Sequence, residues 1–139
     1  MLPADYLAAY EASPPPPTSL HGPLPDLITH HYSSGGCFTL AVALHLATGD
    51  GIELHYRGGL PQHSYITDGG RALDVIGIRP LRAARAGAEK SVAIELNELV
   101  ALLPTIPNGD TLMRDMRRAA SQVAAENTAA ELIEITGWR

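Results

Sequence analysis

Cysteine, aromatic residues and clusters of positive charge are all scarce in this 139-residue sequence. The single cysteine, Cys37, cannot form an internal disulfide, as expected of a protein in a reducing compartment. The formal net charge is −5 and no Lys/Arg run stands out, which argues against nucleic acid or an anionic membrane surface as the main partner. No stretch approaches the roughly 20 apolar residues of a membrane span, and the N-terminus lacks a signal-peptide pattern. We therefore expect a cytoplasmic protein, although an effector delivered by a dedicated export route would have the same composition.

The length and the apolar content predict a single domain over residues 1–139, built around one core. Hydrophobic residues make up 45% of the chain, but only 5% of the chain is aromatic, so we expect an aromatic-poor interior. The spacing of apolar residues changes between a helical and a strand-like period along the chain. The sequence therefore predicts an α+β fold, in which a helix containing the cysteine packs on a small antiparallel sheet and further helices close the chain.

The N-terminal part of the chain is expected to lead up to the cysteine helix. Residues 1–17 fit a short helix, over residues 4–12, followed by a stiff Pro-rich spacer at Pro14 to Pro17. Residues 18–34, with further prolines and two adjacent histidines, are expected to be irregular.

The middle of the chain alternates apolar and polar residues with a period of two, which is typical of half-buried strands. Strands are expected over residues 51–56, 62–67, 71–76 and 91–96. Asp68-Gly69-Gly70 separates the second and third of these strands and is the strongest hairpin signal in the sequence. Arg79, Arg82 and Arg85 recur every three residues in an alanine-rich segment, which indicates a solvated face.

Helices are expected to close the chain over residues 97–139. Asn97 can cap a short first helix. A longer helix is expected over about residues 111–126, with one apolar stripe. Thr128-Ala-Ala-Glu131 fits a capping box that restarts the helix, and Gly137 would end it.

Cys37 stands in the sequence Gly35-Gly36-Cys37-Phe38, at the start of an apolar helix over about residues 36–48 that Gly49 can end. A thiol in the first turn of a helix meets the positive end of the helix dipole, which favours the nucleophilic thiolate. The paired glycines leave no side chain over the sulfur, so a substrate backbone could approach closely. We therefore interpret Cys37 as a nucleophile.

The predicted hairpin places His63 and Asp74 on one face, in either of two registers. If Gly69-Gly70 form the turn, Asp68 pairs with Arg71, and His63 lies diagonally across from Asp74. If Asp68-Gly69 form the turn, His63 and Asp74 lie directly opposite each other. Only an odd-length loop or a bulge would separate them.

Cys37, His63 and Asp74 together fit a nucleophilic triad. The imidazole can take the thiol proton, and the carboxylate can fix the tautomer of the imidazole and stabilise the imidazolium. The backbone N–H of Cys37 is one candidate oxyanion donor, and Tyr32 or His31, just upstream, is the candidate for a second.

These residues resemble the papain-like superfamily, over residues 35–76. Gly35-Gly36-Cys37-Phe38 is similar to the small-residue-Cys-aromatic signature of those enzymes. The segment from His63 to Asp74 is similar to the histidine hairpin of the compact bacterial members, which include cell-wall amidopeptidases, transglutaminase-like proteins and toxin deamidases. The resemblance implies a helix bearing the cysteine packed on an antiparallel sheet, with His63 and Asp74 on adjacent strands. The sequence has no clear counterpart of the glutamine that many papain relatives use in the oxyanion hole.

The functional hypothesis is thiol-dependent acyl transfer at an amide of a protein or peptide substrate. Peptide or isopeptide hydrolysis and glutamine deamidation all pass through an acyl-enzyme, so the sequence does not separate a thiol protease from a deamidase or transferase. The competing hypothesis is a non-enzymatic interaction module, such as a phage- or plasmid-type adaptor, with a buried structural cysteine.

No metal or cofactor is expected. His30 and His31 are adjacent, His45 and His55 belong to different predicted elements, and no paired-cysteine spacing of a zinc site occurs. The glycine pairs follow neither a phosphate-loop nor a dinucleotide-binding pattern. The sequence leaves the oligomeric state open.

Overall fold

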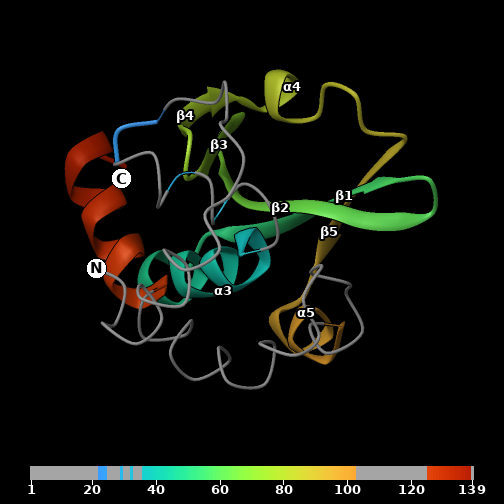
Figure 1. Cartoon of the computed structure of the whole chain (residues 1–139), viewed down its shortest axis with the longest axis horizontal. Coiled ribbons are helices and arrows are strands. Elements are labelled where there is room, and N and C mark those ends of the chain that lie inside the picture. The colour runs from blue at the N-terminus through green and yellow to red at the C-terminus, as the bar shows by residue number, and fades with distance from the viewer. Residues whose placement is uncertain (1–21, 25–28, 30–31, 33–35, 103–124, 139) are drawn as a thin grey trace, which may run out of the picture.

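The computed structural model describes residues 22–24, 29, 32, 36–102 and 125–138, which form a mixed α+β fold (Figure 1). The strands are β1 (Gly51–Arg57), β2 (Leu60–Asp68), β3 (Arg71–Asp74), β4 (Gly77–Pro80) and β5 (Lys90–Ile94). The helices are α3 (Cys37–Thr48), α4 (Leu81–Ala84), α5 (Leu96–Leu102) and the helical residues 125–136. None of the helices in these ranges is long and apolar enough to cross a membrane.

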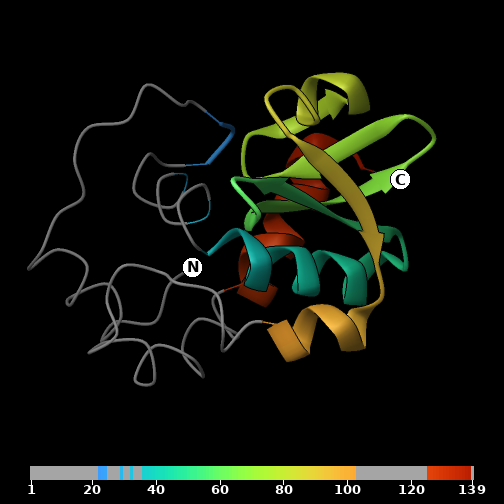
Figure 2. The ribbon, with the colours of Figure 1, turned by 90° about the vertical axis from the view of Figure 1, so that its right-hand side faces the viewer.

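The five strands form one antiparallel sheet in the order β4-β3-β2-β1-β5. Strands β1, β2 and β3 each pair with the next strand along the chain, and β5 returns to pair with β1 at the other edge from β4. Figure 2 shows α3 and α5 together on one side of the sheet and α4 on the other. The expectation of a cysteine helix against a small antiparallel sheet is therefore confirmed.

The main core lies between α3 and the sheet. In the strands, alternate residues point to this side because successive side chains of a strand point to opposite faces. The largest of the fully buried core side chains are Trp138, Tyr32, Leu40, Leu44, Leu54, Ile66, Leu73, Leu99, Leu132 and Val75. The core thus joins α3, the sheet, α5 and the C-terminal helix into one unit.

The hairpin of β2 and β3 adopts the first of the two predicted registers. Gly69 and Gly70 form the turn with left-handed φ values of 56° and 83°, which glycine adopts without a Cβ clash. Asp68 consequently pairs with Arg71. Strand β3 ends at Asp74 rather than at the predicted Ile76, because the chain turns there into β4.

The predicted helix and strands around the hairpin are present, but some of their ends are shifted. The strand expected over residues 91–96 is β5, Lys90–Ile94, because α5 already begins at Leu96. α3 begins at Cys37 and ends at Thr48, and its C-cap is Gly49, whose φ is 76° and whose N–H donates to the His45 carbonyl. Strand β2, expected to start at residue 62, already includes Pro61. A proline is tolerated there because β3 pairs only with residues 66–68 of β2, so Pro61 has a neighbouring strand on one side only.

β4 and α4 are absent from the sequence-based prediction, which assigned this segment to a solvated face of arginines. Each element has only four residues, too few to show a period. Arg82 is exposed as expected, whereas Arg79 and Arg85 form ion pairs with Asp74 and Glu53. The solvated-face prediction is therefore wrong for Arg79, which is only partly exposed, whereas Arg85 is exposed although it binds Glu53.

Two predicted caps are also wrong. Asn97 is the second residue of α5, and the carboxylate of Glu98 instead accepts the backbone N–H of Glu95 at 3.4 Å. Thr128 lies inside the helical residues 125–136, where it is 1% exposed, so no helix restarts at this residue. The N–H of Gly137 donates to the Ile133 carbonyl, and Gly137 ends the helix as predicted.

The remaining predictions concern the N-terminal residues 1–34 and the helix over residues 111–126. The helix over residues 4–12, the Pro-rich spacer and most of the helix over residues 111–126 lie outside the described residues. Within the stretch 18–34, expected to be irregular, Thr29 and Tyr32 are helical and wholly buried. The Thr29 hydroxyl donates to the Leu24 carbonyl, which ties this stretch together locally.

Candidate active site

The fold brings Cys37, His63 and Asp74 into one neighbourhood from three different elements. Cys37 is the first residue of α3, His63 lies within β2, and Asp74 ends β3. The N-cap of α3 is Gly36, which provides no side-chain hydrogen bond to the first turn. The chain order and the elements are those that the sequence predicts.

His63 and Asp74 are joined by a direct hydrogen bond. His63 Nε2 lies 2.7 Å from Asp74 Oδ2, and the bond follows from the hairpin register, which sets the two residues diagonally across β2 and β3. The Asp74 side chain is 3% exposed and that of His63 is 19% exposed. Because Asp74 occupies Nε2, Nδ1 is the ring nitrogen of His63 that remains for a second hydrogen-bond partner.

Cys37 is the other side chain that interacts directly with His63 and favours its protonation. Burial opposes the charged imidazole, but hydrogen bonding and charge attraction to Asp74 and Cys37 outweigh burial and raise the pKa of His63 to about 10. Cys37 itself is 1% exposed. The sulfur and the carboxylate thus act on the same imidazole, from α3 and from β3.

Asp74 has two further partners. Its Oδ2 accepts a hydrogen bond from Arg79 Nη2 at 2.6 Å, and its Oδ1 accepts the backbone N–H of Ile76 at 2.9 Å. Burial raises the pKa of the Asp74 carboxyl, but His63, Arg79 and the Ile76 N–H together bring that pKa below its ordinary value. Asp74 is therefore held as a carboxylate.

A second polar cluster lies beside His63 on the sheet. The Tyr65 ring lies 5.8 Å from the His63 ring, and the Tyr65 hydroxyl donates to Glu53 Oε1 at 2.8 Å. Arg85 donates to both carboxylate oxygens of Glu53, at 2.7 Å each. The hydrogen bonds from Arg85 lower the pKa of Glu53 against the effect of burial, whereas burial and Glu53 raise the pKa of Tyr65 to about 12. Tyr65 is thus a neutral neighbour of His63.

His55 lies directly across β1 and β2 from His63. Burial lowers the pKa of His55, and the charge of His63 lowers it further, which outweighs a hydrogen bond with the backbone of Ala84. His55 Nδ1 is buried without a hydrogen-bond partner. The two facing histidines therefore differ in charge, with His63 as the imidazolium and His55 as the neutral ring.

Of the three candidate oxyanion donors, Tyr32 and the backbone N–H of Cys37 belong to the described residues. Tyr32 is wholly buried and belongs to the main core cluster. His31 lies outside the described residues. The backbone of Cys37 is at the first position of α3, where the N–H groups of a helix have no partner within the helix.

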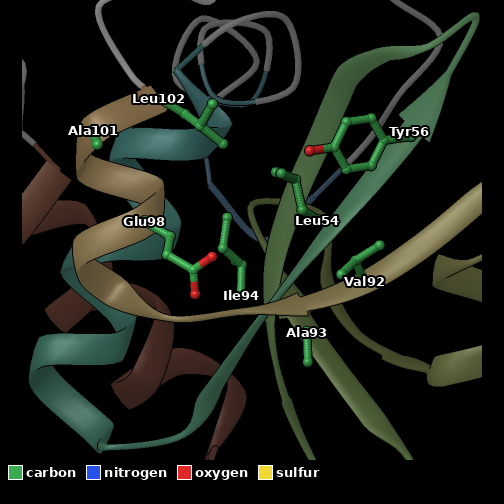
Figure 3. Close-up of a pocket in the computed structure, with 8 residues that line it drawn as sticks. All are labelled: Leu54, Tyr56, Val92, Ala93, Ile94, Glu98, Ala101 and Leu102. Atoms are coloured by element: carbon green, nitrogen blue, oxygen red, sulfur yellow. The ribbon is translucent and has the colours of Figure 1, made fainter.

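The structure also has a pocket whose lining includes none of Cys37, His63 and Asp74 (Figure 3). The pocket lies between α5 and the strands β1 and β5, and Tyr56 and Glu98 provide its polar side chains. The other lining residues are Leu54, Val92, Ala93, Ile94, Ala101 and Leu102. Within the described ranges, no group of three or more His, Cys, Asp or Glu residues could hold a metal ion.

Sequence reasoning missed Arg79, Glu53 and Arg85 as neighbours of the site. The strand period places Tyr65 on the face of His63, but the contact of Arg79 with Asp74 depends on β4, which has no sequence signal of its own.

Comparison with family models, curated proteins and solved structures finds no match for this chain.

Proposed function

We propose that the protein catalyses thiol-dependent acyl transfer at an amide, with Cys37 as nucleophile, His63 as base and then acid, and Asp74 as the residue that orients His63. The observation that carries the proposal is the shared imidazole: His63 interacts with the Cys37 thiol and binds Asp74 through Nε2 at 2.7 Å. An imidazolium beside a cysteine at a helix start favours the thiolate. The arrangement fits a papain-like hydrolase or transferase.

The proposed reaction starts from a pair of charges. The proton of the Cys37 thiol passes to His63 before the attack, which gives a thiolate and an imidazolium, and the Cys37 sulfur then forms a bond to the carbonyl carbon of the amide. The developing oxyanion is placed against the backbone N–H of Cys37, with Tyr32 or His31 as a further candidate donor. His63 then gives its proton to the leaving nitrogen as the C–N bond breaks, which leaves a thioester on Cys37.

A second nucleophile completes the cycle. With the neutral His63 as base, water attacks the thioester carbon and the sulfur leaves, which regenerates Cys37 and releases a carboxylic acid. An amine in place of water would give transfer to a new amide. The substrate class is therefore a protein or peptide amide, whether a main-chain bond, an isopeptide bond or a glutamine side chain.

Alkylation by iodoacetamide tests the proposal without a known substrate. We expect native Cys37 at pH 7 to react at least about tenfold faster than Cys37 in a His63→Ala variant, because the imidazolium stabilises the thiolate. Urea-unfolded protein gives the rate of an exposed, unassisted thiol. Native Cys37 that reacts no faster than Cys37 in His63→Ala would contradict the proposal, as would amidase activity that survives in Cys37→Ala.

The second candidate is a non-enzymatic interaction module in which Cys37 is a structural core residue. The 1% exposure of Cys37 favours this candidate, since free cysteines are often simply buried. It predicts that Cys37 reacts only after unfolding and that Cys37→Ala changes stability alone. The alkylation series therefore separates the two functions.

A further inference from the structure

Asp74 has more partners than the orientation of one imidazole requires. Its Oδ2 accepts hydrogen bonds from His63 Nε2 at 2.7 Å and from Arg79 Nη2 at 2.6 Å. One oxygen therefore lies between an imidazole, whose charge changes during proton transfer, and a guanidinium, whose charge does not. Because Oδ1 is also occupied, by the N–H of Ile76, the carboxylate has fixed partners on both oxygens.

The pairing of β3 and β4 puts Arg79 in this position. Arg79 pairs with Ala72, which sets it diagonally across from Asp74 on the same face of the sheet. The residue directly opposite Asp74 is Gly77, with a φ of 111° and no side chain to stand beside the carboxylate. The Arg79 side chain is 31% exposed and its Nε atom is buried, so the guanidinium lies partly within the protein.

We propose that Arg79 is a positioning residue of the triad, a permanent cation that keeps Asp74 ionised and directed at His63 while His63 alternates between imidazolium and imidazole. When His63 gives up its proton, the buried carboxylate loses one of its two cationic partners. A buried carboxylate without a cation is costly, and Arg79 remains to balance the charge of Asp74 in that state. The catalytic consequence rests on the proposed acyl transfer, whereas the effect on the proton affinity of His63 does not.

The groups that face His63 come from every element around it. Cys37 approaches from α3, Asp74 from β3 and His55 from β1, while the neutral Tyr65 lies beside His63 on β2.

Arg79 acts on His63 through Asp74, since both cations bind the same oxygen. Removal of the guanidinium leaves the negative charge of Asp74 to His63 alone. His63 must then hold its proton more tightly and becomes a poorer acid toward the leaving nitrogen.

A histidine titration followed by NMR tests this inference in the full chain. The Cys37→Ala background removes the contribution of Cys37 to the pKa of His63, so that Asp74 is the remaining side chain that raises this pKa. We expect Arg79→Gln to move the titration midpoint of His63 upward by about one pH unit and Arg79→Lys to leave the midpoint near that of the background. Arg82→Gln, which removes the same charge from an exposed position of α4, is the matched control and should not move the midpoint.

An unchanged or lower midpoint in Arg79→Gln, or an equal shift in Arg82→Gln, would overturn the role of Arg79. If Arg79→Gln does not fold, the unmodified protein decides the question: we expect hindered rotation and slow proton exchange at the Arg79 guanidinium, and free rotation would contradict the proposal. None of these readouts needs enzymatic activity. A shifted midpoint in a protein that shows no activated thiol would therefore refute the acyl-transfer function and leave the role of Arg79 in place.

Discussion

Asp68 and Arg71 pair directly across the Gly69-Gly70 turn, and this one pairing fixes where His63 and Asp74 meet. Counting back from the turn along both strands sets Asp74 opposite Tyr65 and therefore diagonal to His63, at the range that a side-chain hydrogen bond can span. A shift of the register by one residue would put the two side chains on opposite faces. The geometry of the His63–Asp74 pair is thus a consequence of the turn.

Replacement of Asp74 by Asn is expected to lower the pKa of His63 and to reduce any amidase activity at least about 100-fold, since the carboxylate that stabilises the imidazolium is lost while its shape is kept. An NMR titration and a rate measurement at matched pH check both effects. Asp68→Asn, at an exposed pair on the same hairpin, is the control. Retention of full activity in Asp74→Asn would remove Asp74 from the mechanism.

Replacement of His63 by Gln is expected to destabilise the fold in a pH-dependent way. The pKa of His63 rises from 6.5 to about 10 on folding, so its stabilising contribution is full below pH 6.5 and is lost as the pH rises to about 10. The pKa of Asp74 is lowered, so its contribution is present above the ordinary value of 3.8 and is lost as the pH falls. Urea unfolding at pH 5.5, 8 and 10 should therefore show the largest difference at pH 5.5. A difference that grows toward pH 10 would be incompatible with an imidazolium at this position.

Gly22→Ala is expected to disturb the turn that follows Asp74. A Cβ at Gly22 would lie 2.5 Å from the Val75 carbonyl oxygen, a backbone atom with no freedom to move away alone. The expected loss of unfolding free energy is about 1–3 kcal/mol, with a weaker hydrogen bond from Ile76 to Asp74. Gly51→Ala is the matched control because its Cβ would meet only Thr67 Oγ1, at 3.7 Å. Equal thermal stabilities of the two variants would show that Gly22 has room for a methyl group.

Trp138→Phe is expected to cost about 1 kcal/mol, because it removes the hydrogen bond from Nε1 to Asp50 Oδ2 at 2.7 Å but keeps a ring beneath Arg71. Trp138→Ala should cost about 3–5 kcal/mol, since the residue is 1% exposed in the main core. Thermal or urea unfolding of both variants provides the comparison. If Phe and Ala cost the same, the ring itself contributes nothing and the hydrogen bond carries the whole effect.

The parts of the fold that the sequence predicts are those with local causes. α3 is bounded by Gly36 and Gly49, and the hairpin register follows from two adjacent glycines in a turn that needs positive φ at both positions. Because side chains alternate along strands, the common face of His63 and Asp74 could be derived before any contact was known.

The features that the sequence does not predict depend on contacts between residues far apart in the chain. Glu53 alternates with apolar residues and therefore looks solvent-facing, yet it is 6% exposed because Arg85, 32 residues further on, donates two hydrogen bonds to it. Thr128 has the local signature of a helix start, but the helix already includes Ala125, and both residues are buried. The sequence immediately around Glu53 or Thr128 does not determine how either residue is buried.

The strand order also indicates in which sequence the parts of the site form during folding. All residues of the proposed triad, and Arg79 with them, belong to a continuous run from α3 through β4 in which each strand pairs with its successor, while β5 closes the sheet from a distance. Contacts between neighbours in sequence need little loop closure, so this run can order early in folding and β5 can dock afterwards. An insertion into the turn between α4 and β5 should therefore slow completion of the sheet and leave the His63–Asp74 geometry untouched.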